Sequence, residues 1–208
     1  MKKITSLLVL SLALLSGCSS TQKATIVGNK ITNPTVGFNG YETPIPIGYV
    51  IADPSDQVGK EIINMAHTAI EPQSFTRSLG GAYIRDEIIM YDKKNNSYIS
   101  FFVLELNIPG SLSQIPAPKF EKFKERIERS SNGQLSANFT EHYDLGSPYT
   151  LEFHGSDIAG IDPIITSGYF TFGKLNEIIA VVGHTTNIQS HQEFEDAVRS
   201  MMFGTKIL

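Results

Sequence analysis

The sequence predicts an α+β fold: a mainly antiparallel sheet of about seven strands with helices packed on its faces, as in an α-β-α sandwich. Stretches rich in Val, Ile, Phe and Tyr follow one another in pairs, and short turn sequences separate the members of each pair. Three amphipathic helical stretches are interspersed with these pairs. Strands joined by short turns pair antiparallel, and each helix must bury its apolar stripe against the sheet.

Residues 25–52 predict one or two short strands with turns. The stretch is rich in Val, Ile, Thr and Tyr, and Gly and Pro interrupt it. Pro44 and Pro46 lack the N–H that a sheet ladder needs, so we expect them at a sheet edge or in a loop.

A first helix is expected after Asp53, which suits the N-cap position. Pro54 fits the first turn, and Asp56 suits the positive end of the helix dipole. Pro72 is expected to end the helix. The residues at helical spacing that should face the core are Val58, Ile62, Met65, Ala66, Ala69 and Ile70.

Residues 80–108 predict a β-hairpin with its turn at Asp92–Asn96. The second strand is apolar on both faces, with Phe102 on one and Phe101 on the other. We therefore expect it to be a central strand that is covered on both sides. The polar turn has two interpretations, a plain solvated turn or a loop that binds a partner from a rigid scaffold.

A second helix is expected over residues 118–130, where charged residues surround a narrow apolar stripe, and Gly133 suits its C-terminal cap. The charge run is typical of a solvated helix face. Two strand pairs follow it: Leu135–Tyr143 with Tyr149–His154 around Gly146, and Ile164–Phe172 with Glu177–His184 around Gly173. The last strand is again apolar on both faces.

The final helix is expected to begin near Ser190, because Ser190 and Glu193 have the spacing of a capping box. Its inward-facing residues should be Phe194, Ala197, Val198 and Met201.

The first eighteen residues predict an export signal that ends in a lipid anchor. A basic start, Met1-Lys2-Lys3, precedes a mostly apolar run that is too short for a spanning helix. The last four positions, Leu15-Ser16-Gly17-Cys18, resemble a bacterial lipobox. The resemblance implies cleavage before Cys18 and acylation of Cys18, and two or three acyl chains anchor a protein stably. The alternative is an ordinary signal peptide with an accidental cysteine.

The expected organisation is a signal peptide over residues 1–17, a lipidated cysteine with a short tether over 18–30, and a single α+β domain over 31–208. Ser19, and not Asp, follows Cys18. In the lipoproteins of diderm bacteria that this sequence resembles, a residue other than Asp after the cysteine implies sorting to the outer membrane, on the side that faces the periplasm. The membrane of a Gram-positive bacterium is the alternative location.

The composition argues against nucleic acid or an anionic membrane surface as a partner. Loss of residues 1–17 removes Lys2 and Lys3, which leaves fifteen basic against 21 acidic residues. Cys18 is the only cysteine of the chain, so no disulfide can stabilise the fold, and packing must do so.

The sequence carries no motif for a metal, a cofactor or a catalytic centre. The glycines lack phosphate-binding or dinucleotide-binding spacing, and no serine lies in a nucleophile-elbow motif. The histidines lack short ligand spacing; they are His67, His142, His154, His184 and His191. We expect His184 to be a hydrogen-bonded residue at the rim of the sheet. His154 and Asp157, in the stretch HGSD, are the strongest enzymatic candidates.

Three stretches together resemble the PsbP-like fold. These are the opening NPTVGFNGYETPIPIGYV, with Gly37-Phe38 and Gly48-Tyr49, the hairpin GYFTFGKLNEIIAVVGHT, and the helix EFEDAVRSMMF. The family includes extrinsic photosystem proteins, a Ran-binding factor and envelope lipoproteins of the DcrB type. The resemblance implies an α-β-α sandwich and a non-enzymatic role in support of a partner. It transfers no catalytic residues. The family's opening usually has Trp or Tyr after the glycine; Tyr49 fits this pattern, and the chain has no tryptophan.

These observations favour a membrane-anchored lipoprotein of the bacterial cell envelope that binds or supports another envelope protein without catalysis. Two alternatives remain. One is a cell-wall-associated hydrolase that uses His154 and Asp157, and the other is an immunity-type protein that blocks a toxin in the periplasm.

Overall fold

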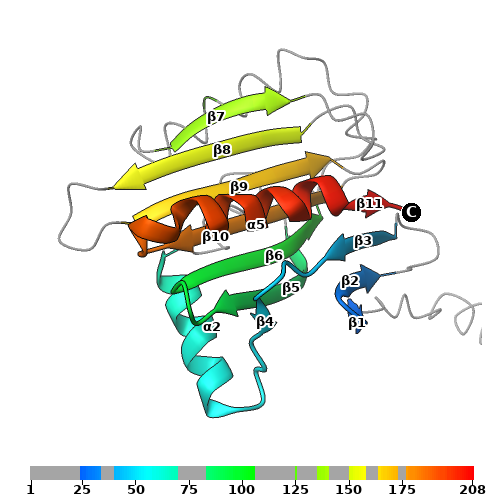
Figure 1. The fold of residues 1–208 in the computed structure, drawn as a ribbon. Coiled ribbons are helices and arrows are strands. Elements are labelled where there is room, and N and C mark those ends of the chain that lie inside the picture. The colour runs from blue at the N-terminus through cyan, green and yellow to red at the C-terminus, as the bar shows by residue number, and fades with distance from the viewer. Residues whose placement is uncertain are drawn as a thin grey trace, which may run out of the picture.

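The computed structural model describes residues 24–33, 40–69, 83–105, 125, 135–140, 150–157, 164–172 and 177–208. The expected helix over 118–130, apart from residue 125, and the turns at Gly146 and Gly173 lie outside these residues, as does Cys18. The described residues form an α+β architecture with two antiparallel sheets (Figure 1).

The larger sheet has seven strands, and all its neighbouring strands are antiparallel. Their order across the sheet is β4 (Val50–Ile51), β5 (Tyr83–Asp92), β6 (Ser97–Glu105), β10 (Glu177–Thr185), β9 (Ile164–Phe172), β8 (Thr150–Asp157) and β7 (Leu135–Thr140). The three predicted hairpins are therefore confirmed. The predicted double-sided burial of β6 is also confirmed, because Ser97–Leu104 are all buried.

A second sheet of four strands departs from the expected single sheet. Its order is β1 (Thr25–Val27), β2 (Lys30–Asn33), β3 (Tyr41–Pro44) and β11 (Lys206–Ile207). β1 and the turn at Gly28 lie in the stretch for which the sequence predicts a tether. Gly28 has a φ of +62°, a conformation that suits the first central position of a two-residue hairpin turn. Residues 25–52 thus form four strands instead of one or two.

Buried hydroxyl groups connect the two ends of the described chain. The hydroxyls of Thr43, in β3, and Thr205, next to β11, lie 2.9 Å apart across 162 residues. The Tyr169 hydroxyl lies 3.0 Å from that of Thr205, which itself donates to the Met201 carbonyl. Because buried polar groups are costly unless paired, these contacts specify how β11 meets β3.

α5 (His191–Gly204) and the four-stranded sheet pack on one face of the seven-stranded sheet. α5 buries the predicted residues, Phe194, Ala197, Val198 and Met201. Gly183 of β10 lies directly under the helix: a Cβ on it would stand 2.6 Å from Cε2 of Phe194. The small sheet contributes Ile31 and Tyr41 to the same core, where the rings of Tyr41 and Phe101 lie 5.3 Å apart.

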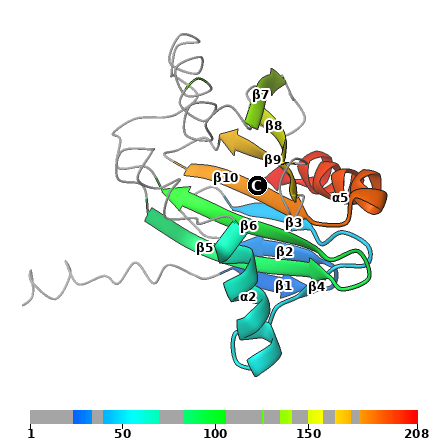
Figure 2. The same cartoon turned by 90° about the vertical axis from the view of Figure 1, so that its left-hand side faces the viewer.

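α2 (Gln57–Ala69) covers the opposite face, in front of β5 and β6 in Figure 2. Ile62 and Ala66 pack with Ile89 and Tyr98. Among the other residues expected to face the core, Val58 and Met65 are instead exposed. The buried stripe of α2 is therefore narrower than the helical spacing of its apolar residues predicts.

The caps of both helices differ from the prediction. The Asp56 carboxylate accepts from the N–H of Gly59, three residues on, as an N-cap does, whereas Asp53 accepts from Ser55 in the turn before the helix. A side chain at Gly59 would collide with the Asp53 carbonyl, so this turn lies tightly against α2.

At α5, Ser190 occupies the N-cap position but makes no side-chain cap bond. Its hydroxyl donates to the Asn187 carbonyl instead, within the short 3₁₀ helix η3 (Ile188–Ser190). The Glu193 carboxylate accepts from Asn95. The expected capping box is therefore wrong, because both of its side chains have other partners.

Candidate functional site

A β-bulge in β5 places two charged side chains inside the molecule. Ile84 pairs with Leu104 and Asp86 pairs with Val103, so Arg85 is an extra residue with no partner position on β6. Bulges redirect side chains in this way. The Arg85 and Asp86 side chains contact each other, and they are only 4% and 3% exposed.

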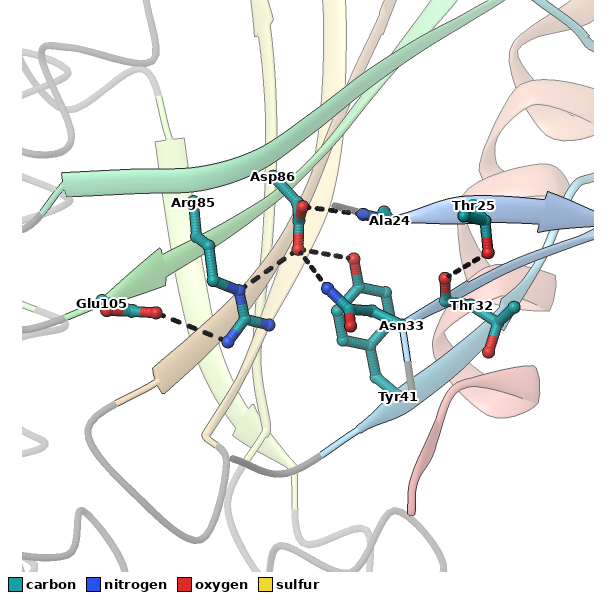
Figure 3. Close-up of polar contacts among 8 residues, drawn as sticks. All are labelled: Ala24, Thr25, Thr32, Asn33, Tyr41, Arg85, Asp86 and Glu105. Carbon is teal, nitrogen blue, oxygen red and sulfur yellow. Dashed lines mark hydrogen bonds and ion pairs between the residues drawn. The ribbon is translucent and has the colours of Figure 1, made fainter. Parts of the chain in front are cut away.

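The Asp86 carboxylate is the centre of a buried hydrogen-bond cluster (Figure 3). Its Oδ1 accepts from the backbone N–H of Ala24 at 3.0 Å. Its Oδ2 accepts from Asn33 Nδ2 at 3.1 Å, from the Tyr41 hydroxyl at 3.0 Å and from Arg85 Nε at 3.2 Å. Asp86 therefore binds three segments of the small sheet to the main sheet.

Arg85 extends the cluster to a second carboxylate. Its Nη1 lies 3.5 Å from Glu105 Oε1, and its guanidinium lies 6.0 Å from the centre of the Tyr41 ring. Burial raises the pKa of Glu105. The Arg85 cation thus lies between two carboxylates, and this arrangement offsets part of the desolvation free energy that the burial of the three charged groups costs.

The Asp86 cluster is suited to stabilising the fold and not to reacting with a substrate. A general base must reach a substrate proton, and the Asp86 side chain is almost fully buried and already accepts four hydrogen bonds. Its most distant partner in sequence is Ala24, the first described residue, which follows Cys18 by six positions. The cluster therefore holds the first described residue against the main sheet.

A second polar group lies in a shallow cleft between α5 and the strands β8 and β9. Nδ1 of His154 lies 3.1 Å from the Ser167 hydroxyl. The carboxylates of Glu195 and Glu152 lie 3.9 and 4.0 Å from the two ring nitrogens. Arg199 also lines the cleft.

This cleft only partly matches the predicted hydrolase site. β9 pairs Ser167 with His154 but Ile164 with Asp157, so His154 and Asp157 are three residues apart on one strand. Positions three apart on a strand belong to opposite faces. The structure therefore supplies Ser167 and two glutamates as partners of His154, and the register does not bring Asp157 to them.

Ser167 is poorly placed for nucleophilic attack. It is only 2% exposed, whereas the His154 side chain is 42% exposed. A nucleophile must meet substrate, so the contact is better explained as a hydroxyl that orients the imidazole.

The other described histidines have structural surroundings. His184 is buried and stacks on Tyr98 with ring centres 4.9 Å apart, and burial lowers its pKa to about 4. His184 does lie near the end of β10, as expected, but it is buried and stacked there. His67 Nε2 lies 2.7 Å from Glu87, between α2 and β5, and His191 contacts the Ile188 carbonyl. His142 lies outside the described residues.

The polar turn Asp92–Asn96 is attached to the start of α5. Asp92 accepts from the Lys94 N–H and from Asn95, and Asn95 donates also to Glu193. Asn96 has a φ of +47° and donates to Thr186. The turn is thus more constrained than a plain solvated turn.

Two kinds of feature are absent from the described part of the chain. No group of three His, Cys, Asp or Glu residues there could hold a metal ion. No described helix is long and apolar enough to cross a membrane.

The sequence contained one unused signal for the Asp86 cluster. Arg85 and Asp86 are adjacent charges inside an otherwise apolar strand, which interrupts the alternation of that strand. Such an interruption indicates a bulge or a buried ion pair. Its partners, 62, 53 and 45 residues away, were not recognisable from local pattern.

No protein-family model matches the chain, and no curated protein sequence matches it. Among solved structures, the solution structure of cyanobacterial PsbP (CyanoP) from Synechocystis sp. PCC 6803 aligns with a TM-score of 0.49 and 11% identity, over 94% of this chain and 99% of that chain. A chain of the Tle4-Tli4 complex crystal structure aligns with a TM-score of 0.38 and 11% identity, over 100% of this chain and 86% of that chain. Neither likeness assigns this chain to a family.

Proposed function

We propose that the chain is a lipid-anchored protein of the bacterial cell envelope that binds or supports another envelope protein without catalysis. The anchor is Cys18, at the end of the lipobox-like sequence Leu15-Ser16-Gly17-Cys18. One structural observation supports the proposal most directly. Asp86 accepts a hydrogen bond from the N–H of Ala24, only six residues after Cys18, so an anchor at Cys18 would hold the described domain close to its membrane.

The described polar groups support a non-catalytic role. The Asp86 carboxylate is buried and accepts four hydrogen bonds, and the Ser167 hydroxyl beside His154 is covered. Enzymatic centres need a reactive group that is open to substrate. The proposal therefore assigns the function to the surface of the domain.

The test compares the full-length wild-type protein with Cys18→Ala, both expressed in a diderm bacterium and extracted from membranes with detergent. The proposal expects a wild-type intact mass that corresponds to a chain beginning at Cys18 and carrying acyl groups. It also expects the wild type in the membrane fraction and Cys18→Ala in the soluble fraction. An unacylated wild type that is soluble like the variant would contradict the anchor.

A hydrolase is the second candidate, and the 3.1 Å contact of Ser167 with His154 is the observation that favours it. The purified domain would be offered bacterial cell wall, with Ser167→Ala and His154→Gln as matched variants. Turnover that both variants lose would replace the non-catalytic proposal with this one. Turnover that persists in both would exclude this cleft as the centre.

A further inference from the structure

The four-stranded sheet packs on the main sheet through one face, and its other face is the outer face of this part of the described fold. Strand register defines this outer face by Thr25, Val27, Lys30, Thr32, Glu42, Pro44 and Lys206. The residues that alternate with them, Ile31, Asn33, Tyr41 and Thr43, are buried against the main sheet. The outer face therefore points away from the core, and Val27 on it is 63% exposed.

The outer face carries more positive than negative charge, although the whole chain is acidic. Lys30 and Lys206 lie on either side of Glu42, its one carboxylate. Lys30 Nζ lies 2.5 Å from Glu42 Oε1. The hydrogen bond from Lys30, together with the charges of both lysines, lowers the pKa of Glu42 and keeps it ionised. The two ammonium groups leave a net charge of +1 on this face of a chain whose formal net charge is −4.

The same sheet begins within the expected tether, at Thr25. Five residues separate Cys18 from Ala24, so the Cα atoms of these two residues can lie at most about 20 Å apart. Asp86 fixes Ala24 at the start of β1, the edge strand of this sheet. No other described segment is as close to Cys18 along the chain.

We propose that the outer face rests on the lipid headgroups of the membrane in which Cys18 is anchored. This inference rests on the proposed lipid anchor. Anionic headgroups attract lysines that lie within about a Debye length, roughly 8 Å at physiological salt. The exposed Val27, beside the tight turn at Gly28, supplies an apolar contact at the interface. Contact through this face orients the rest of the domain, including the cleft at His154, relative to the bilayer.

The absence of tryptophan from the chain allows a direct test. Val27→Trp and Val58→Trp each introduce a single fluorophore at valines with nearly equal exposure, 63% and 61%. Val58 lies on α2, on the opposite side of the main sheet, and serves as the matched control. The acylated full-length proteins are reconstituted into vesicles of phosphatidylethanolamine with a minority of phosphatidylglycerol and a quencher attached to the lipid headgroup.

The proposal expects strong quenching of the indole in Val27→Trp and little quenching of the indole in Val58→Trp, in protein that floats with the vesicles. Replacing both lysines, as Lys30→Gln with Lys206→Gln, should reduce the equilibrium constant for the contact by about fivefold per lysine, and high salt should do the same. Equal quenching in the two variants, or none in Val27→Trp, in protein that floats would overturn the contact while the anchor stands.

Two other outcomes also decide the proposal. Protein that lacks acyl groups and does not float contradicts both the anchor and the contact. Protection of the indole in Val27→Trp that occurs in native membranes but not in pure lipid vesicles means that a protein covers the outer face, and this result overturns a lipid contact in favour of a protein partner.

Discussion

The phenol of Tyr41 donates a 3.0 Å hydrogen bond to Asp86, 45 residues further along the chain, and thereby joins β3 of the small sheet to β5 of the main sheet. Asp86 combines this bond with those from Ala24, Asn33 and Arg85. The stability of the small sheet should therefore depend on this one carboxylate.

Asp86→Asn should destabilise the domain by about 3 kcal/mol, because it leaves the buried Arg85 guanidinium without its adjacent negative charge. Tyr41→Phe removes one neutral donor and should cost only about 1 kcal/mol. Urea unfolding of the two variants measures the difference. The exposed Thr25→Val serves as a control and should change stability by less than about 0.5 kcal/mol. Equal stability of Asp86→Asn and wild type would show that the cluster does not hold the sheets together.

Gly183→Ala should loosen the packing of α5 on β10. The added methyl would stand 2.6 Å from the Phe194 ring, and overpacking of this kind costs about 1–3 kcal/mol. Phe194→Leu in the same chain should recover part of the loss, and a double-mutant cycle of unfolding free energies measures the coupling. Additive effects of the two substitutions would mean that the residues do not constrain each other.

His184 should make the domain less stable in acid. Burial lowers the pKa of His184 to about 4 in the folded protein, while the unfolded chain has the ordinary value of about 6.5. The unfolded state therefore binds a proton first as the pH falls, and stability from this group is lost between about pH 6.5 and pH 4. The loss reaches about 3 kcal/mol.

The measurement is urea unfolding at several pH values in this range for the wild type and for His184→Phe. Phenylalanine keeps the stacking on Tyr98 but cannot take up a proton. In the variant, the free energy of unfolding should change less steeply with pH, because the contribution of His184 is missing. Parallel slopes for the two proteins would refute the assignment.

Asp56→Ala should destabilise α2 by about 1 kcal/mol, because the Gly59 N–H loses its cap. Asp56→Ser keeps an accepting oxygen and should restore most of the stability. Helical circular dichroism and thermal unfolding measure the effect. A larger loss of helical signal in Asp53→Ala than in Asp56→Ala would contradict the assignment of Asp56 as the cap.

The sequence predicted the hairpins, α2 and α5 because their signals are local. Alternation along strands, helical spacing in α5 and polar turns each lie within about twenty residues. The pairing of β3 with β11 and the Asp86 cluster were missed because their contacts join distant segments. Ala24 meets Asp86 across 62 residues, and no local pattern in β1 indicates that partner.

The site predictions divide in the same way. The HGSD stretch directed attention to His154, and the partners of this histidine come from β9 and α5. HGSD placed Asp157 near it in sequence, while strand alternation separates the two positions. Adjacency along a strand is thus a poor guide to a polar cluster, and pairing between strands is a better one.

The pairing of β3 with β11 has a consequence for the order in which the chain can fold. The hydroxyl of Thr43 can contact that of Thr205 only after Thr205, 162 residues later in the chain, has been synthesised. During synthesis the small sheet therefore lacks a strand until nearly all of the described chain has been made, and contacts of such long range form slowly.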